Sequence, residues 1–118
     1  MISSVCLDYG PGGKFTPKTW DMGELKSAVS KWQTFMHDNN GWNALYLENH
    51  DQPRIVTRFG VDTPEHRELS AKMLATFQGF QEGTLFIYQG QELGMPNIPR
   101  SWKINQYRDI ETLNHWME

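Results

Sequence analysis

Two short apolar runs, each ending abruptly in polar residues, constrain the fold of this chain most strongly. Residues 44–47 read Ala-Leu-Tyr-Leu and are followed by Glu-Asn-His-Asp, and residues 84–88 read Thr-Leu-Phe-Ile-Tyr and are followed by Gln-Gly-Gln-Glu. Short runs of apolar, β-branched and aromatic residues between turn-forming residues are typical of buried strands. We therefore expect strands at residues 44–47 and 84–88, each with a polar cluster at its C-terminal end.

A helical pattern precedes each of these runs. Asp21 is a suitable N-cap for a helix that we expect to end near residues 39–41, and a second helix is expected to begin at residues 63–65. The expected apolar faces of the two helices consist of Leu25, Val29, Trp32 and Met36, and of Leu69, Met73, Phe77 and Phe80. A further short helix is expected around residues 109–116, a short strand in residues 1–10 and a loop in residues 11–19. Alternating helices and strands indicate a parallel α/β sheet or barrel, in which function gathers at the C-terminal ends of the strands.

Composition excludes several classes of partner. The 118 residues are 38% hydrophobic and carry a formal net charge of −3, with no basic stripe, which argues against nucleic acid or an anionic membrane as partner. Cys6 is the single cysteine and cannot form an internal disulfide. The first residues lack the pattern of a signal peptide, and no apolar run reaches transmembrane length. We therefore expect a soluble, cytoplasmic protein.

Three stretches of the sequence are specific enough to compare with known families. They are Tyr-Leu-Glu-Asn-His-Asp-Gln-Pro-Arg at residues 46–54, Gly-Thr-Leu-Phe-Ile-Tyr-Gln-Gly-Gln-Glu-Leu-Gly-Met at residues 83–95, and the segment leading into the first of these from residue 31. Together they resemble glycoside hydrolase family 13, within it the α-glucosidases (maltases and oligo-1,6-glucosidases), especially the fungal ones. The resemblance covers about residues 14–116. It implies an α/β fold that is part of a (β/α)8 TIM barrel, from the helix after strand six through strand eight and its following loop. Residues 1–118 would then be a fragment of the catalytic domain.

The resemblance also implies roles for individual residues. Asp51 matches the family's third carboxylate, which accepts hydrogen bonds from the 2- and 3-hydroxyls of the sugar in the first subsite. Such bonds strengthen as a retaining glycosidase reaches its oxocarbenium-like transition state. His50 is implied to contact the same hydroxyls. Arg54 is a candidate for substrate binding, or equally for pairing with a carboxylate such as Glu48 to hold the loop.

The implied activity is retaining hydrolysis of α-glucosidic bonds in maltose-type or isomaltose-type oligosaccharides, with a small oligosaccharide as partner and with no cofactor. The family's nucleophilic aspartate motif and acid/base glutamate motif do not occur in this chain, so we expect the isolated chain to be inactive. A non-catalytic carbohydrate-binding or scaffold relative of the same barrel is the alternative.

A metal site is a less favoured interpretation. Glu48, His50 and Asp51, joined by His37 or His66, are metal-ligand types, but no His-x-x-x-His or Cys-x-x-Cys spacing occurs. We expect Glu92 to bond backbone amides around the turn that follows the second strand.

Overall fold

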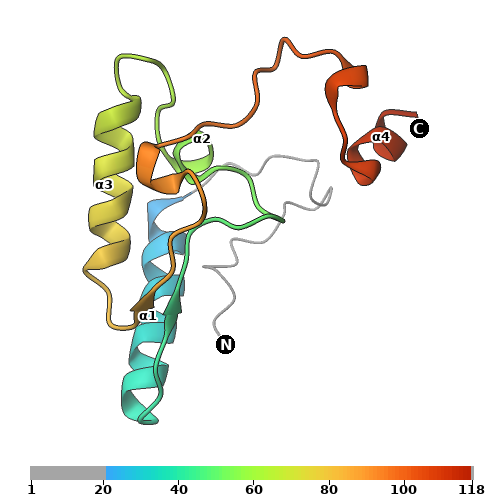
Figure 1. Cartoon of the computed structure of the whole chain (residues 1–118). Helices are drawn as coiled ribbons and strands as arrows, with labels where there is room; N and C mark the ends of the chain where they lie inside the picture. The colour runs from blue at the N-terminus through green and yellow to red at the C-terminus, as the bar shows by residue number, and fades with distance from the viewer. Residues whose placement is uncertain (1–20, 118) are drawn as a thin grey trace.

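The computed structural model describes residues 21–117 (Figure 1). The strand and loop expected before residue 20, and Cys6, lie outside the described residues. In chain order the elements are α1 (Met22–Asp38), β1 (Ala44–Leu45), α2 (Ile55–Phe59), α3 (Arg67–Gly79), β2 (Thr84–Leu85), two short 3₁₀ helices, η1 (Gln91–Leu93) and η2 (Ile104–Gln106), and α4 (Ile110–Met117). Figure 1 shows α1 and α3 as the two long helices, with α4 lying apart from them at the end of an extended segment.

The two strands pair in parallel, as expected. Ala44 is opposite Thr84, and Leu45 is opposite Leu85. Each strand is only two residues long, so the expected lengths of 44–47 and 84–88 are wrong at their C-terminal ends. Beyond the paired residues, the backbones of Phe86 and Tyr88 bond to glutamine side chains.

Helix α1 begins and ends where its sequence predicts. The Oδ1 atom of Asp21 accepts hydrogen bonds from the backbone N–H of Gly23 at 2.7 Å and of Glu24 at 3.2 Å, so it satisfies donors that the first turn leaves free. At the other end, the side-chain amide of Asn39 donates to the carbonyl of Phe35 at 2.7 Å. The helix therefore has a side-chain bond at each end.

The buried core lies between α2, α3 and the end of the first strand. It consists of Ile55, Val56 and Leu74, with Leu47, Phe59 and Ala71 packed against them. Helix α2, which holds two of these residues, is not among the elements expected from the sequence. Its five residues directly after Pro53-Arg54 are too few to show a helical period.

The prediction of which side chains α3 buries is largely wrong. Leu69, Met73 and Phe80 have exposed fractions of 69%, 50% and 89%, and the residues that α3 buries are Leu74 and Gln78. The helix has two adjacent stripes, and the one that contains Leu74 and Gln78 faces the strands and α2. The helix also begins later than expected, at Arg67, after a turn in which the N–H of Arg67 donates to the carbonyl of Thr63 at 2.8 Å.

Helix α4 lies where the sequence predicts a short helix. The Oδ2 atom of Asp109 accepts hydrogen bonds from the N–H and from the hydroxyl of Thr112, both at 2.7 Å. Among the described helices none is both long and apolar enough to cross a membrane.

Candidate functional site

The segment that links β1 to α2 carries the candidate site residues. The side-chain oxygen of Asn49 accepts a hydrogen bond from the N–H of Asp51 at 2.9 Å, and its carbonyl accepts from the N–H of Gln52 at 3.2 Å. An asparagine that bonds the backbone two residues on forms a tight turn. The turn holds His50 and Asp51 at the surface beyond the C-terminal end of β1.

His50 and Asp51 present their side chains side by side. The Nε2 atom of His50 is 3.3 Å from the Oδ2 atom of Asp51, and the two side chains are 78% and 71% exposed. A carboxylate accepts hydrogen bonds only, whereas an imidazole also donates them. The pair therefore offers both an acceptor and a donor to the hydroxyls of a ligand.

Below this turn, Glu48 is a buried carboxylate with both oxygens bonded. Its Oε1 atom is 2.8 Å from Nη1 of Arg54, and its Oε2 atom accepts from the N–H of Ile55 at 2.6 Å. The side chain of Glu48 is only 1% exposed, so its charge requires these partners. Of the two roles considered for Arg54, the structure thus shows the pairing with Glu48. A contact between Arg54 and substrate stays a prediction.

Arg54 also reaches the segment that follows β2. Its Nη1 atom donates to the carbonyl of Gln89 at 2.6 Å, its Nη2 atom lies 3.1 Å from the sulfur of Met95, and its guanidinium lies 5.0 Å from the ring centre of Tyr88. The sequence does not predict these contacts, because Gln89 and Met95 carry no signal beyond their place after the second strand. Arg54 therefore fastens the two polar strand ends to each other.

Glu92 has the role that its position predicts. Its Oε2 atom accepts a hydrogen bond from the N–H of Gly90 at 2.9 Å, inside the turn after β2. Gly90 and Gly94 have φ angles of 89° and 61°, a conformation that favours glycine. This geometry makes Glu92 a part of the turn's own structure.

Within residues 21–117, no group of three or more His, Cys, Asp and Glu side chains is placed to hold a metal ion. His37 and His66, the histidines considered for such a site, have local partners. The Nδ1 atom of His37 lies 3.5 Å from the carboxylate of Glu82, and that of His66 lies 3.2 Å from the hydroxyl of Thr63.

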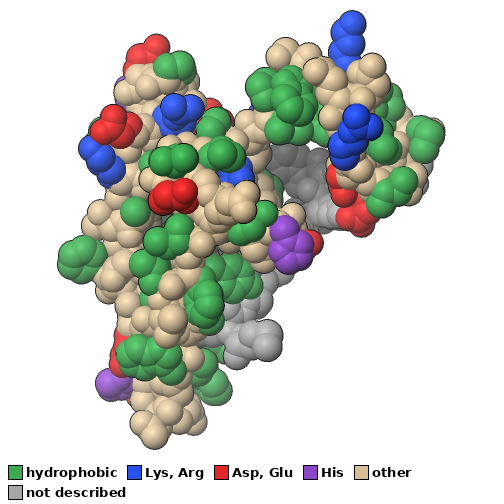
Figure 2. All heavy atoms as spheres, in the orientation of Figure 1, with side chains coloured by type: hydrophobic (Ala, Val, Ile, Leu, Met, Phe, Trp, Pro, Cys, Tyr) green, Lys and Arg blue, Asp and Glu red, His purple; other side chains and the backbone are tan. Residues whose placement is uncertain are grey.

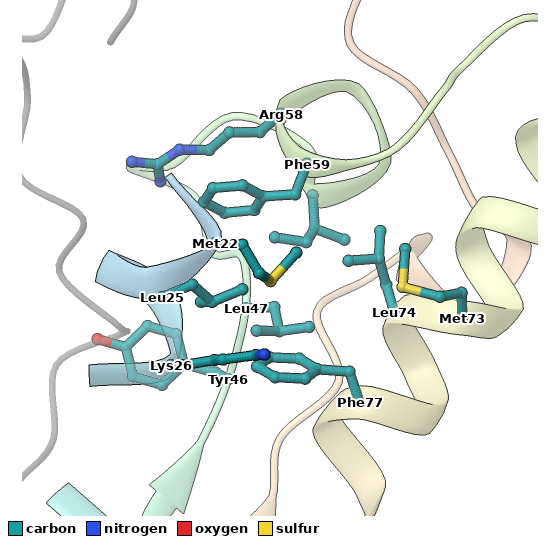
Figure 3. A pocket seen from close by; sticks show the side chains of 11 residues that line it. Met22, Leu25, Lys26, Tyr46, Leu47, Arg58, Phe59, Met73, Leu74 and Phe77 are labelled. Atoms are coloured by element: carbon teal, nitrogen blue, oxygen red, sulfur yellow. The ribbon is translucent and has the colours of Figure 1, made fainter. Parts of the chain in front are cut away.

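Two hollows flank the first strand and its continuation. One, of about 230 Å³, lies among α1, α2 and α3 and is lined mainly by apolar side chains, including Leu25, Phe59 and Phe77 (Figure 3). None of the described residues that line it carries a carboxylate or an imidazole. The other, of about 370 Å³, lies at the strand ends and is lined by Ala44, Tyr46, Glu48, Asn49, Phe86, Ile87 and Tyr88. The second hollow is therefore the one that adjoins the polar strand ends.

Comparison with known proteins agrees with the motifs. The family described as "Alpha amylase, catalytic domain" matches residues 2–118. An α-glucosidase of Schizosaccharomyces pombe is 46% identical over 113 residues, and an oligo-1,6-glucosidase of Parageobacillus thermoglucosidasius is 54% identical over 112 residues. Each alignment covers 95% of this chain, but only 20% and 19% of the relative.

A solved structure gives the same result. The crystal structure of Bacillus licheniformis trehalose-6-phosphate hydrolase matches with a TM-score of 0.87 and 49% identity, covering 96% of this chain and 20% of that one. The chain thus spans about a fifth of the length of the relatives that it matches. From the family match and these identities, we conclude that the chain belongs to the α-amylase family, glycoside hydrolase family 13, and corresponds to part of its catalytic domain.

Proposed function

We propose that this chain forms strands seven and eight, with the helices before and between them, in the barrel of a retaining α-glucosidase. The order helix, strand, helix, strand and the parallel pairing of β1 with β2 support this placement. In a TIM barrel the residues that act on substrate lie on the loops after the strands. Both such loops in this chain are polar and are joined by Arg54.

The observation that carries the proposal is the exposed pair of His50 and Asp51 above a buried, fully bonded Glu48. In this proposal Asp51 accepts hydrogen bonds from two sugar hydroxyls next to the bond that breaks, and His50 donates to one of them. Hydrogen bonds to an ionised acceptor are stronger than those between neutral groups. Bonds to the 2-hydroxyl that strengthen in the transition state accelerate the reaction itself.

The proposed substrates are short oligosaccharides with α-glucosidic bonds, of the maltose and isomaltose type. The names of the relatives, α-glucosidase and oligo-1,6-glucosidase, support this class. The nucleophile and the acid/base group would come from barrel strands that precede this segment. In this proposal Asp51 and His50 therefore bind the sugar and stabilise the transition state. The nucleophile and the acid/base group, on other strands, carry out the cleavage of the glycosidic bond.

A chimera tests the proposal. The chimera is the P. thermoglucosidasius oligo-1,6-glucosidase in which the matching 112 residues are exchanged for this chain. We expect it to fold with a cooperative thermal transition and to hydrolyse isomaltose or a chromogenic α-glucoside. A chimera that does not fold would contradict the barrel placement, and one that folds without activity would favour the non-catalytic alternative.

The Asp51→Asn substitution in the chimera then tests the residue. We expect kcat to fall by about 10²–10³, the usual effect of removing one group that stabilises a transition state, with an unchanged melting temperature. Asp62→Asn is the matched control, because Asp62 is an exposed aspartate that lies outside the turn and should leave kcat unchanged. Wild-type turnover in the Asp51 variant would refute the assignment.

A further inference from the structure

The two strands separate after Leu45 and Leu85, and glutamine side chains take up the backbone groups that the separation leaves free. If the register continued, the carbonyl of Phe86 would accept from the N–H of Leu47, and the N–H of Tyr88 would donate to the carbonyl of Leu47. Instead, Phe86 accepts from the Nε2 atom of Gln78 at 3.0 Å. The N–H of Tyr88 donates to the Oε1 atom of Gln91 at 3.1 Å.

Gln78 connects helix α3 to both strand ends. Its side chain is buried, with a residue exposure of 2%, on the face of α3 that packs against the strands. The Nε2 atom donates to the carbonyl of Leu45 at 2.9 Å as well as to that of Phe86, and the Oε1 atom accepts from Nε2 of Gln91 at 2.7 Å. A buried amide costs free energy unless it is hydrogen-bonded, and here both its ends are.

This network leads to the candidate site. Gln78 bonds Gln91, which holds the N–H of Tyr88. The carbonyl of Gln89, two peptide units further along the chain, accepts from Arg54 at 2.6 Å, and Arg54 pairs with Glu48 at the base of the turn that presents Asp51. Each step is a direct hydrogen bond or a short stretch of backbone.

We propose that Gln78 is a positioning residue of this glycosidase, acting through Gln91 and the backbone of residues 88–89 on Arg54, and so on the Asp51 turn. The inference rests on the proposed function. Without the Gln78 amide, the carbonyl of Phe86 and the amide of Gln91 lose partners, and the strands are free to pair further. Residues 88–89 then shift, and a displacement of about 1 Å at a catalytic site lowers rates by about 10²-fold.

The test is Gln78→Met in the chimera, since methionine has a similar length but no N–H donor. We expect kcat per folded enzyme to fall by about 10- to 100-fold with KM within about twofold, because positioning matters most in the transition state. Gln81→Met is the matched control. Among the described residues its side-chain amide donates to the carbonyl of Phe77, one turn back, and not to either strand end, so the change should leave kcat unchanged.

Two further measurements separate positioning from loss of stability. Gln91→Met, in a turn outside the core, should lower kcat similarly, and the double variant should be no slower than the slower single variant, because both act through one relay. The Gln91→Met variant also keeps the proposal testable if Gln78→Met does not fold. Unchanged kcat in either folded variant, or effects that multiply in the double variant, would overturn the proposal.

Amide exchange in the chimera keeps this inference separate from the proposed function. Gln78→Met should speed exchange at the N–H of Tyr88 at least tenfold while leaving that of Thr84, which donates to the carbonyl of Asn43, unchanged. This result is independent of activity, so an inactive chimera would refute the function and still test the relay. Equal exchange rates at the N–H of Tyr88 in the chimera and in its Gln78→Met variant would refute the relay.

Discussion

The guanidinium of Arg54 lies 2.8 Å from the carboxylate of Glu48, and the two side chains are only 20% and 1% exposed. A second pair in this chain, Lys72 and Glu68, is also close but is 70% and 81% exposed. Ion pairs of these two kinds respond differently to the removal of one partner. Loss of a buried partner leaves a charge that water does not reach, whereas loss of an exposed partner is compensated by solvent.

The Arg54→Met substitution in the chimera is therefore expected to lower the free energy of unfolding by about 3–5 kcal/mol, the usual cost of leaving a buried charge unpaired. Urea denaturation measures this change. Lys72→Met is the control and should leave the urea midpoint nearly unchanged. Equal shifts in the two variants would show that Glu48 is not isolated from solvent.

The exposed pair gives a prediction for pH. The hydrogen bond from Lys72, followed by the attraction of its charge, lowers the pKa of Glu68 below its ordinary value. A carboxyl whose pKa is lowered by folding contributes stability above its unfolded pKa and loses it as the pH falls through the folded pKa. NMR titration should therefore show Glu68 ionised at lower pH than a free glutamate, and Lys72→Met should return its pKa toward the ordinary value.

His50→Ala in the chimera is expected to lower kcat/KM for isomaltose by about 10- to 100-fold. This is the usual effect of losing one hydrogen bond in which a partner is charged or becomes charged in the transition state. The effect should be smaller than that of Asp51→Asn. His66→Ala is the control, since the imidazole of His66 bonds the hydroxyl of Thr63 in the turn before α3, away from the Asp51 turn. Equal losses in the two histidine variants would contradict the proposed role of His50.

Two glycines provide a matched test of the backbone before β2. Gly83 has a φ of 153°, and a Cβ atom there would lie 2.6 Å from the carbonyl oxygen of Asn43. Gly83→Ala should therefore destabilise the chimera by about 1–3 kcal/mol. Gly79→Ala, at the last residue of α3, where a Cβ meets no described atom within 4 Å, should stabilise the chimera by about 0.4–1 kcal/mol. Thermal denaturation of both variants measures the two changes in stability. Destabilisation by both substitutions would contradict the prediction.

The 118-residue chain on its own is expected to have no α-glucosidase activity, because the resemblance places the nucleophile and the acid/base group outside it. Large apolar side chains are exposed on the described residues, among them Phe80 at 89%, Leu93 at 74% and Ile87 at 56%. Figure 2 shows apolar side chains in several separate patches on the face in view. Such surfaces bind hydrophobic dyes and promote association. Assay of the purified chain with a chromogenic α-glucoside, together with dye fluorescence, tests both points, and measurable cleavage would direct attention to Glu48 or Glu92.

Local signals in the sequence predict much of this fold. Asp21 caps a helix where its position before an apolar period predicts one, a short helix lies near residues 109–116 as expected, and the parallel pairing follows from the alternation of helices and strands. The ion pair of Glu48 with Arg54 is one of the two alternatives that the sequence leaves open, since a carboxylate at a strand end needs a partner. The roles of His50 and Asp51 come from the resemblance, and they stay predictions.

Features that depend on distant parts of the chain could not be read in this way. The apolar residues of α3 form two stripes, and only packing decides that Leu74, and not Phe80, is buried. In the sequence Gln78 looks like an ordinary solvated helix residue, because its hydrogen bonds depend on two strands that separate beside it. Helix α2 forms on Ile55 and Val56, which are held by tertiary contacts and not by a periodic pattern.

The seam between the two strands joins parts of the chain that are far apart in sequence. The indole N–H of Trp42 donates to the hydroxyl of Thr84 across 42 positions, and the side-chain amide of Asn43 donates to the carbonyl of Glu82 across 39. Closing loops of this length costs chain entropy before any contact repays it, so such pairings tend to form late in folding. The Asp51 turn depends on Arg54, whose partner carbonyl lies beyond this seam. We therefore expect the loops that follow the two strands to be completed late in folding.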